Sequence, residues 1–319
     1  MTGRPGVTRL ALVGAALIAS ASGVVLRPSP DRAGAAVPGG IALTQTWIRD
    51  LNDAPCGVAM ASPVEATLDQ EGPAVEVGDR QGDIYAFHLA DGTVPAGWSS
   101  SAPSGTLGAG QGCGNPASDA STAQPAVGVN GIAVPGNPPI DSTSSVTATA
   151  DGTSDLYFGA GNAFVPYTGG YYSYGADAQL RWNQAVVNPP TDTAPAIGVQ
   201  ASPTVGTAAG VPFVSAGSLG QETDTLATAN GSLLSGWPFF SADSVFSTAA
   251  VGDLYGNGQD DLVVGGASSA GFAYGRHYEN GGHVRIMNNH GGVICSADTN
   301  EEVDSSPAVG PILPGGMLG

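Results

Sequence analysis

A short phrase that recurs along the chain constrains the fold more than any other feature of this sequence. Each copy begins with small residues, reaches a proline or alanine and continues into a β-branched segment. The five copies start at Ala61, Ala123, Ala201, Ser247 and Ser305. Their marker residues are spaced 62, 78, 46 and 58 residues apart, at Pro63, Pro125, Pro203, Ala249 and Pro307. Self-similarity at a period of this size indicates an architecture built from stacked repeats.

The same order of features follows each marker and predicts four short strands per unit. After the marker strand come a glycine-rich turn, a β-branched strand that ends in glycine, a third strand, and a turn of the Asp-Gly or Asn-Gly type. A tryptophan closes three of the units, at Trp98, Trp182 and Trp237. Such turns favour tight hairpins because their residues tolerate positive φ. Four-stranded antiparallel units at this period are typical of a β-propeller, whereas a sandwich does not predict a recurring phrase and a solenoid repeats at a shorter period.

Composition agrees with an all-β chain that is rich in turns. The 319 residues include 49 Gly and 24 Pro, and only 11 % of them are charged, which is too few for long solvent-exposed helices. Residues 36–319 carry 26 acids and five arginines, a net charge of −21. That charge disfavours nucleic acid and anionic lipid as partners and favours divalent cations.

The ends of the chain raise the question of how the ring closes. Trp47 has the setting of a fourth-strand tryptophan although it precedes the first marker, so we expect it to complete the last blade. Three strands of that blade are missing, because the sequence stops soon after the fifth marker. We therefore expect about four blades plus an incomplete one, truncated at the C-terminus. The alternative is an open four-bladed array.

The first 36 residues predict an export signal, which leaves residues 37–319 as the propeller domain. Arg4 and Arg9 precede an apolar stretch from Leu10 to Leu26, and Ala33–Ala35 resembles a cleavage site. We expect a secreted protein with no transmembrane segment after the signal. An uncleaved N-terminal anchor is the alternative, because the stretch is long for a signal and short for a spanning helix.

The three cysteines, Cys56, Cys113 and Cys295, suit an oxidising compartment. The odd number leaves one thiol free or paired with another chain. Cys56 with Cys113 is our first expectation for a disulfide.

The repeats resemble a known family of propellers. The segment STAAVGDLYGNGQDDLVVGG, which starts at Ser247, looks like the FG-GAP or VCBS-type repeat of integrin-α-like propellers, and the Asp-Gly turn followed by Trp is similar to PQQ-like propeller repeats. The resemblance covers roughly residues 44–319. It implies an extracellular bladed propeller, often used for adhesion or ligand binding, with Ca²⁺ held in loops between strands.

The family's oxygen-rich pattern, carried over residue by residue, predicts one calcium loop. The positions are Asp253, Tyr255, Asn257, Gln259 and Asp261, with the backbone carbonyl of Gln259 as its donor. We expect Asp253, Asn257, Gln259 and Asp261 to supply ligands, because calcium takes six to eight oxygens. Tyr255 departs from the pattern, since a phenol is a poor substitute for a carboxylate. The alternative is a turn in which Asp and Asn bond only to their own backbone.

Other polar and aromatic residues predict structural roles. Asp69, Glu71, Asp151 and Asp155 fit ordinary turns, His277, His283 and His290 fit a surface, and His88 stands isolated in a strand. The run from Phe164 to Tyr174 lies in an insertion of the second unit and is rich in aromatics. It predicts a loop that contacts sugar or protein; the alternative is that these residues pack the insertion onto its blade.

No nucleophile motif is present, and a quinone-dependent dehydrogenase of the PQQ-like kind is not expected, because the chain has no adjacent cysteines. We therefore predict a secreted non-enzymatic propeller that binds an extracellular protein or glycan. The alternative is a polysaccharide-active enzyme on the same fold, which would need acids with perturbed pKa converging in one pocket.

Overall fold

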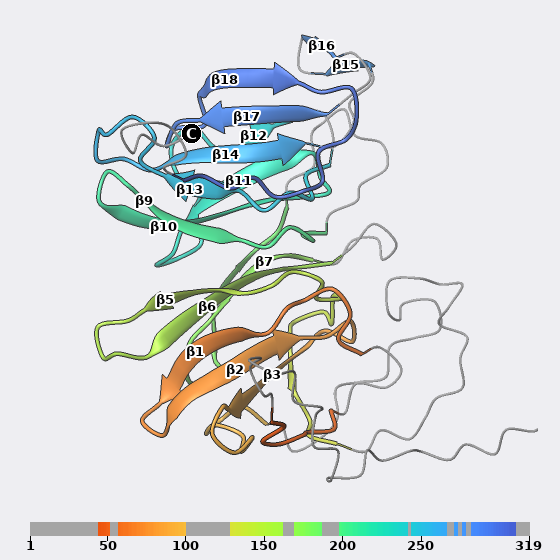
Figure 1. Cartoon of the computed structure of the whole chain (residues 1–319), viewed down its shortest axis with the longest axis vertical. Helices are drawn as coiled ribbons and strands as arrows, with labels where there is room; N and C mark the ends of the chain where they lie inside the picture. The colour runs from red at the N-terminus through yellow and green to blue at the C-terminus, as the bar shows by residue number, and fades with distance from the viewer. Residues whose placement is uncertain are drawn as a thin grey trace, which may run out of the picture. The chain divides into compact units, whose positions relative to one another are not determined.

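In the part of the chain that the structure describes, four antiparallel four-stranded sheets each form one blade (Figure 1). The structure is a computed structural model. It describes residues 44–51, 57–99, 128–161, 169–186, 198–241, 244–266, 271–273, 276–278 and 282–310. The proposed signal, Cys56, Cys113 and the end of the chain from 311 lie outside these residues.

Strands follow one another across each sheet in chain order. Blade 1 contains β1 (Val64–Asp69), β2 (Gly72–Gly78), β3 (Asp83–His88) and β4 (Ile132–Ala133). Blade 2 contains β5 (Ser145–Ala148), β6 (Ser154–Ala160), β7 (Gly170–Tyr174) and β8 (Leu180–Gln184). Blade 3 contains β9 (Thr204–Ala208), β10 (Val211–Gly217), β11 (Glu222–Ala227) and β12 (Phe239–Phe240). Blade 4 contains β13 (Ala250–Gly252), β14 (Asp261–Gly266), β17 (His283–Met287) and β18 (Val293–Asp298).

A small extra hairpin, β15 (Gly271–Ala273) and β16 (Arg276–Tyr278), lies between β14 and β17 in the sequence. The predicted β-propeller of about four blades is confirmed by this arrangement of sheets.

One predicted unit boundary is wrong. The second unit was placed at Ala123, but Ile132–Ala133 still belongs to blade 1 and the second blade begins at Ser145. The marker of blade 2 is the segment Ser142–Ser144, in which serine replaces the proline. Residues 89–131 therefore separate the third strand of blade 1 from its fourth strand.

Apolar side chains fill the space between consecutive blades. Successive residues of a strand point to opposite faces, so Tyr171 packs toward blade 3 while Tyr172 and Tyr174 pack toward blade 1. Phe158 stacks on both of the latter rings, with centroids 5.7 and 5.8 Å apart. A third cluster joins blade 3 to blade 4 through Phe213, Leu262 and Met287, among other residues. Each blade thus buries one face against the next.

A glycine at the last or next-to-last position of the second strand in every blade is explained by close packing. A Cβ atom on Gly159 would lie 2.2 Å from Cγ1 of Val199, a residue of the segment that leads to the next blade. The equivalent contacts in the other blades join Gly78 to Ile140, Gly217 to Val245, and Gly265 to Val303. Only glycine leaves room for the linking segment here.

The marker segments are also joined to one another by hydrogen bonds. The backbone N–H of Ser62 donates to the hydroxyl of Thr143 at 2.8 Å, and Thr143 N–H donates to Ser202 Oγ at 2.9 Å. The N–H of Thr248 donates to Ser306 Oγ at 3.1 Å. The segment at Ser306 therefore bonds to blade 4 as the earlier markers bond to the blades before them.

Three tryptophans attach one blade to the next, and Trp47 attaches the segment before blade 1 to that blade, through equivalent bonds. Each indole N–H donates to a carbonyl in the turn after a third strand, and the four distances are 2.9, 2.8, 2.8 and 3.2 Å. The pairs are Trp47 with Leu89, Trp98 with Ala176, Trp182 with Thr228, and Trp237 with Asn289. No strand contains Trp47, and its predicted role in completing the last blade stays a prediction.

Candidate functional site

The predicted calcium loop connects β13 to β14, and its side chains are bonded to backbone. The carboxylate of Asp253 accepts from the N–H groups of Asn257 at 2.9 Å and Gly258 at 2.8 Å, and these bonds lower the pKa of Asp253. The side-chain oxygen of Asn257 accepts from Gln259 N–H at 2.8 Å. These bonds form a compact turn at the exposed end of the hairpin.

The second half of the loop contacts neighbouring strands. The side-chain oxygen of Gln259 accepts from Ala209 N–H and from Asn289, so this side chain points out of the loop. Asp260 accepts from Thr207 N–H in blade 3 at 2.7 Å. Asp261 accepts from Leu254 N–H at 3.3 Å.

Burial raises the pKa of Asp261, and repulsion from Asp253 and Asp260 raises it further. Two carboxylates at the ends of the loop therefore repel each other, which is the electrostatic setting that a cation relieves. Both belong to the oxygen donor class that calcium takes. Tyr255 is exposed.

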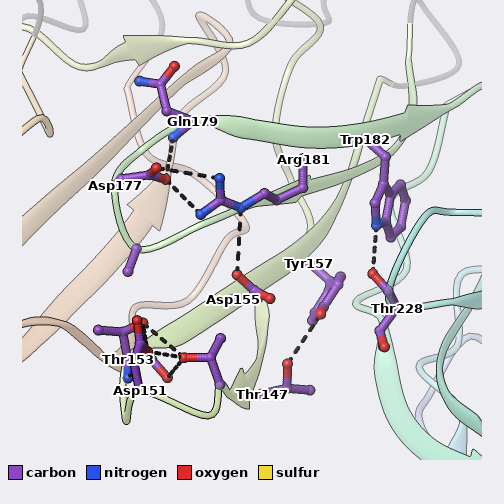
Figure 2. Close-up of polar contacts among 12 residues, drawn as sticks. Thr147, Asp151, Thr153, Asp155, Tyr157, Asp177, Gln179, Arg181, Trp182 and Thr228 are labelled. Carbon is purple, nitrogen blue, oxygen red and sulfur yellow. Dashed lines mark hydrogen bonds and ion pairs between the residues drawn. The ribbon is translucent and has the colours of Figure 1, made fainter.

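The acids at the turns of blade 2 have structural partners, as the sequence predicted. Asp151 accepts from the hydroxyl and N–H of Thr153, and Asp155 and Asp177 flank Arg181 at 3.9 and 3.0 Å (Figure 2). Arg181 thus supplies a cation for the acids of this blade.

His88 is not isolated, and that prediction is corrected. Its Nε2 atom lies 3.0 Å from the carboxylate of Asp69, and its Nδ1 atom lies 3.0 Å from Thr93 Oγ1. Glu71 is the third member of this group, with Oε2 4.0 Å from His88 Nδ1. Asp69 and Glu71 follow β1, whereas His88 ends β3, so the sequence separates residues that the sheet brings together.

His283 is also buried, contrary to the predicted surface position. It begins β17, where Nδ1 lies 2.9 Å from the carboxylate of Asp298 on the adjacent strand. His290 is exposed as predicted, and the side chain of His277 lies outside the described residues.

Two buried acids face blade 2 from strand β11 of blade 3. Glu222 is 0 % exposed and Asp224 is 3 % exposed. Burial raises the pKa of Asp224 to about 6, although hydrogen bonding with Tyr171 and Glu222 opposes the rise. Burial also raises the pKa of Tyr171, and both acids add to that effect. Two neighbouring buried carboxylates do not both ionise readily, so the pair keeps a proton to higher pH than a free carboxyl does.

Another buried acid, Glu76, lies at the blade 1–2 interface. Glu76, on β2, is 1 % exposed, and burial raises its pKa to about 7, opposed by Ser144. Its neighbours in β2 are valines on both sides. The strand pattern alone does not indicate that the acid between them is buried.

An ion pair crosses the segments that link the blades. Arg80 binds Asp141 through two bonds of 2.6 and 3.1 Å, and Gln200 donates to the same carboxylate at 3.1 Å. The pair joins residues 61 positions apart, so no spacing rule could have found it.

The remaining candidates are settled by burial. Tyr171, Tyr172 and Tyr174 lie buried in β7, so they pack the interfaces instead of forming a binding loop, while Phe164 lies outside the described residues.

Cys295 is exposed on β18 with a free thiol. Within the described residues there is no helix long and apolar enough to cross a membrane.

Comparisons with known proteins show distant likeness in structure only. No protein-family model and no curated protein sequence matches the chain. Solved structures similar to it include BBS1N in complex with ARL6DN (10 % identity, TM-score 0.39, 78 % of this chain and 57 % of that one). BamB from Moraxella catarrhalis is similar at 13 % identity and TM-score 0.36, over 78 % of this chain and 79 % of that one. A europium-containing methanol dehydrogenase is similar at 11 % identity and TM-score 0.38, over 65 % of this chain and 39 % of that one. The chain thus spans less than two thirds of the first of these structures.

Proposed function

We propose that this chain is a secreted, non-enzymatic β-propeller scaffold that binds an extracellular protein or glycan. The observation that carries the proposal is the burial of the two acids whose pKa values are raised most, Glu76 and Asp224. Glu222 and Asp224 are 0 % and 3 % exposed and face Tyr171, and Glu76 lies in a different interface. Acids in these positions act on the packing of blades, whereas a catalytic pair must contact substrate.

The binding surface that we propose is the edge formed by the connections between second and third strands and by the segments that link blades. Antiparallel order places all of these connections at the same edge. They differ in length: four residues (79–82) separate β2 from β3, whereas the β15–β16 hairpin lies between β14 and β17. Connections that vary on a common framework are typical of binding surfaces. The excess of acids favours a neutral or cationic ligand.

The polysaccharide-active alternative is favoured by one observation, the adjacency of Glu222 and Asp224. Two carboxyls of which one keeps its proton are the groups that glycosidases use. Their burial argues against this role.

One experiment separates these two functions. The purified protein is applied to an array of extracellular glycans and proteins, and the same glycans are assayed in solution for release of reducing ends. We expect binding without product. Product formed by the natural protein and lost in a folded Asp224→Asn variant would overturn the scaffold proposal.

Hydrogen exchange with the bound array ligand then locates the surface. We expect slower exchange in the linking segments, such as 134–144 and 299–306, and no change in the turns 149–153 and 209–210 at the opposite edge. Protection confined to those turns would contradict the proposed surface.

Calcium stabilisation of the 253–261 loop is a second part of the proposal, together with the FG-GAP or VCBS-type resemblance that suggests it. Asp253, Asn257 and Asp261 would hold the ion through side-chain oxygens and Gln259 through its carbonyl. The repulsion that raises the pKa of Asp261 supports this, because bound calcium would offset it.

The test compares melting temperatures in calcium and in chelator. We expect calcium to raise the melting temperature of the natural protein and of Asp260→Asn, whose side chain bonds to Thr207 instead. We expect no rise in the Asp253→Ala/Asp261→Ala double variant. An equal rise in all three proteins would exclude this loop as the site.

Export is the remaining part of the proposal. The apolar stretch before residue 36 supports cleavage near Ala35, and an uncleaved membrane anchor is the alternative. Intact mass measurement of the protein collected from the medium tests it, because a species that begins with Met1 and stays with membranes would contradict secretion.

A further inference from the structure

Three side chains with metal-binding atoms converge at one turn of blade 1. Asp69, Glu71 and His88 each offer a ligand atom, and these atoms all lie within 4.8 Å of one another. None of these three residues belongs to the predicted calcium loop, which lies in blade 4. The cluster therefore requires its own explanation.

Local structure fixes the positions of these groups. Asp69 ends β1, and its carboxylate accepts from the N–H of Glu71 at 2.8 Å, which holds the β1–β2 turn. His88 ends β3 and pairs with Ala74 in the adjacent strand, so its ring lies beside that turn. The His88 side chain is 5 % exposed, whereas Glu71 is 77 % exposed. The site thus combines the buried imidazole nitrogen of His88 with the carboxylate of Glu71, which is open to water.

The second nitrogen of His88 has a partner of the kind that supports metal-bound histidines. Nδ1 lies 3.0 Å from Thr93 Oγ1, and that hydroxyl donates to Asp91 at 2.7 Å. When a metal ion binds Nε2, the Nδ1–H group can donate to this hydroxyl, which a carboxylate holds in turn, and such a partner orients the ring of a metal-bound histidine. Nε2 is the atom that faces Asp69, at 3.0 and 3.1 Å from its two oxygens.

In blade 2, an arginine supplies a positive charge at the place that corresponds to His88 in blade 1. There, Gly175 occupies the position of His88, and the guanidinium of Arg181 lies against it, between Asp155 and Asp177 (Figure 2). In blade 1 the carboxylates of Asp69 and Glu71 lie beside the imidazole of His88 instead, and Asp91 bonds to Thr93 next to it.

Arg49, which precedes blade 1 in the chain, is a cation close to this turn, and its guanidinium donates to backbone carbonyls. Its Nε donates to Gly92 at 2.5 Å and its terminal nitrogen to Asp91 at 3.5 Å. A dication at the His88 site would do for three carboxylates what Arg181 does for the acids of blade 2.

We propose that Asp69, Glu71 and His88 bind a divalent transition-metal ion, with Zn²⁺ as the best match. Zinc takes imidazole nitrogen and carboxylate oxygen together, and three protein ligands leave a position for water. The ion replaces the hydrogen bond between His88 and Asp69, and Glu71 turns inward to complete the set. The site joins the turn after β1 to the end of β3.

Zinc binding is measured by calorimetry on chelator-treated protein, and Co²⁺ serves as a spectroscopic probe of imidazole ligation. We expect one Zn²⁺ per chain. Because loss of an outer partner already weakens metal sites by about tenfold or more, Glu71→Gln and His88→Gln should each raise the Kd by at least that factor. Asp151→Asn is the matched control, because Asp151 occupies the corresponding turn of blade 2 and should leave the Kd unchanged.

Glu71→Gln decides the outcome if His88→Gln fails to fold, because Glu71 is largely exposed. An unchanged Kd in a folded Glu71→Gln variant, or equal weakening in Asp151→Asn, would overturn the proposal. The Asp253→Ala/Asp261→Ala protein should bind Zn²⁺ normally, which separates this site from the calcium loop.

Discussion

Replacement of Glu76 by glutamine should remove a large part of the dependence of stability on pH. Glu76 is 1 % exposed in the blade 1–2 interface, and neither carboxylate oxygen has a hydrogen-bond partner of normal geometry among the described residues. Burial raises its pKa from 4.5 to about 7, and the Ser144 hydroxyl offsets only part of the rise. The folded state therefore favours the neutral acid.

The sign and size of the effect follow from proton linkage. Below pH 4.5 the carboxyl is neutral in both states and carries no ionisation penalty. As the pH rises, the unfolded chain ionises first, so the free energy of unfolding falls until the folded carboxyl also ionises near pH 7. At about 1.4 kcal/mol for each pH unit, the loss amounts to about 3 kcal/mol.

Urea unfolding at pH values from 4.5 to 8 measures this loss. The natural protein should lose about 3 kcal/mol more over that range than Glu76→Gln, whose amide does not ionise. Asp224→Asn is the control, since it removes the other acid with a strongly raised pKa and leaves the contribution of Glu76 in place. Parallel pH profiles for the natural protein and Glu76→Gln would refute the reasoning.

Two further substitutions test the contacts between blades by urea unfolding. Gly159→Ala should destabilise the protein by about 2 kcal/mol, because its Cβ would meet Val199 at 2.2 Å, whereas Gly252→Ala should be close to neutral because nothing lies within 4 Å; equal effects would contradict the packing explanation. Trp182→Phe should lower the free energy of unfolding by at least about 1 kcal/mol, because it removes the 2.8 Å bond to the Thr228 carbonyl; an unchanged value would mean that this bond is not formed in solution.

The repeat carried most of the information about the fold. The recurring marker, the turn glycines and the closing tryptophans predicted units whose starts at Ala61, Ala201 and Ser247 agree with three of the four blades. The predicted start of blade 2 was wrong because Ser144 stands where the other markers have proline or alanine. The sequence pattern is weaker there, although the hydrogen bonds of the marker are kept. Thr143 still accepts from Ser62, as its counterparts do in other blades.

The polar groups were less predictable because their environment depends on which strands meet. Asp69 and His88 are 19 residues apart, and they lie together because β2 pairs with both β1 and β3 and so brings the two strand ends to the same edge of the sheet. His283 was expected on the surface, yet the packing of β17 buries it. Burial of Glu76 likewise depends on the face that blade 2 covers. Sequence spacing contains no record of these long-range relations.

The indole N–H groups provide the most direct test of the claim that each blade is attached to the next through an equivalent bond. The chain has four tryptophans, so an ¹H–¹⁵N spectrum should contain four indole signals, each assigned by its Trp→Phe variant. After transfer to D₂O, the signals of Trp98, Trp182 and Trp237 should exchange slowly, because these side chains are buried and bonded. Exchange of these three signals at the rate of a free indole would contradict the attachment of the blades.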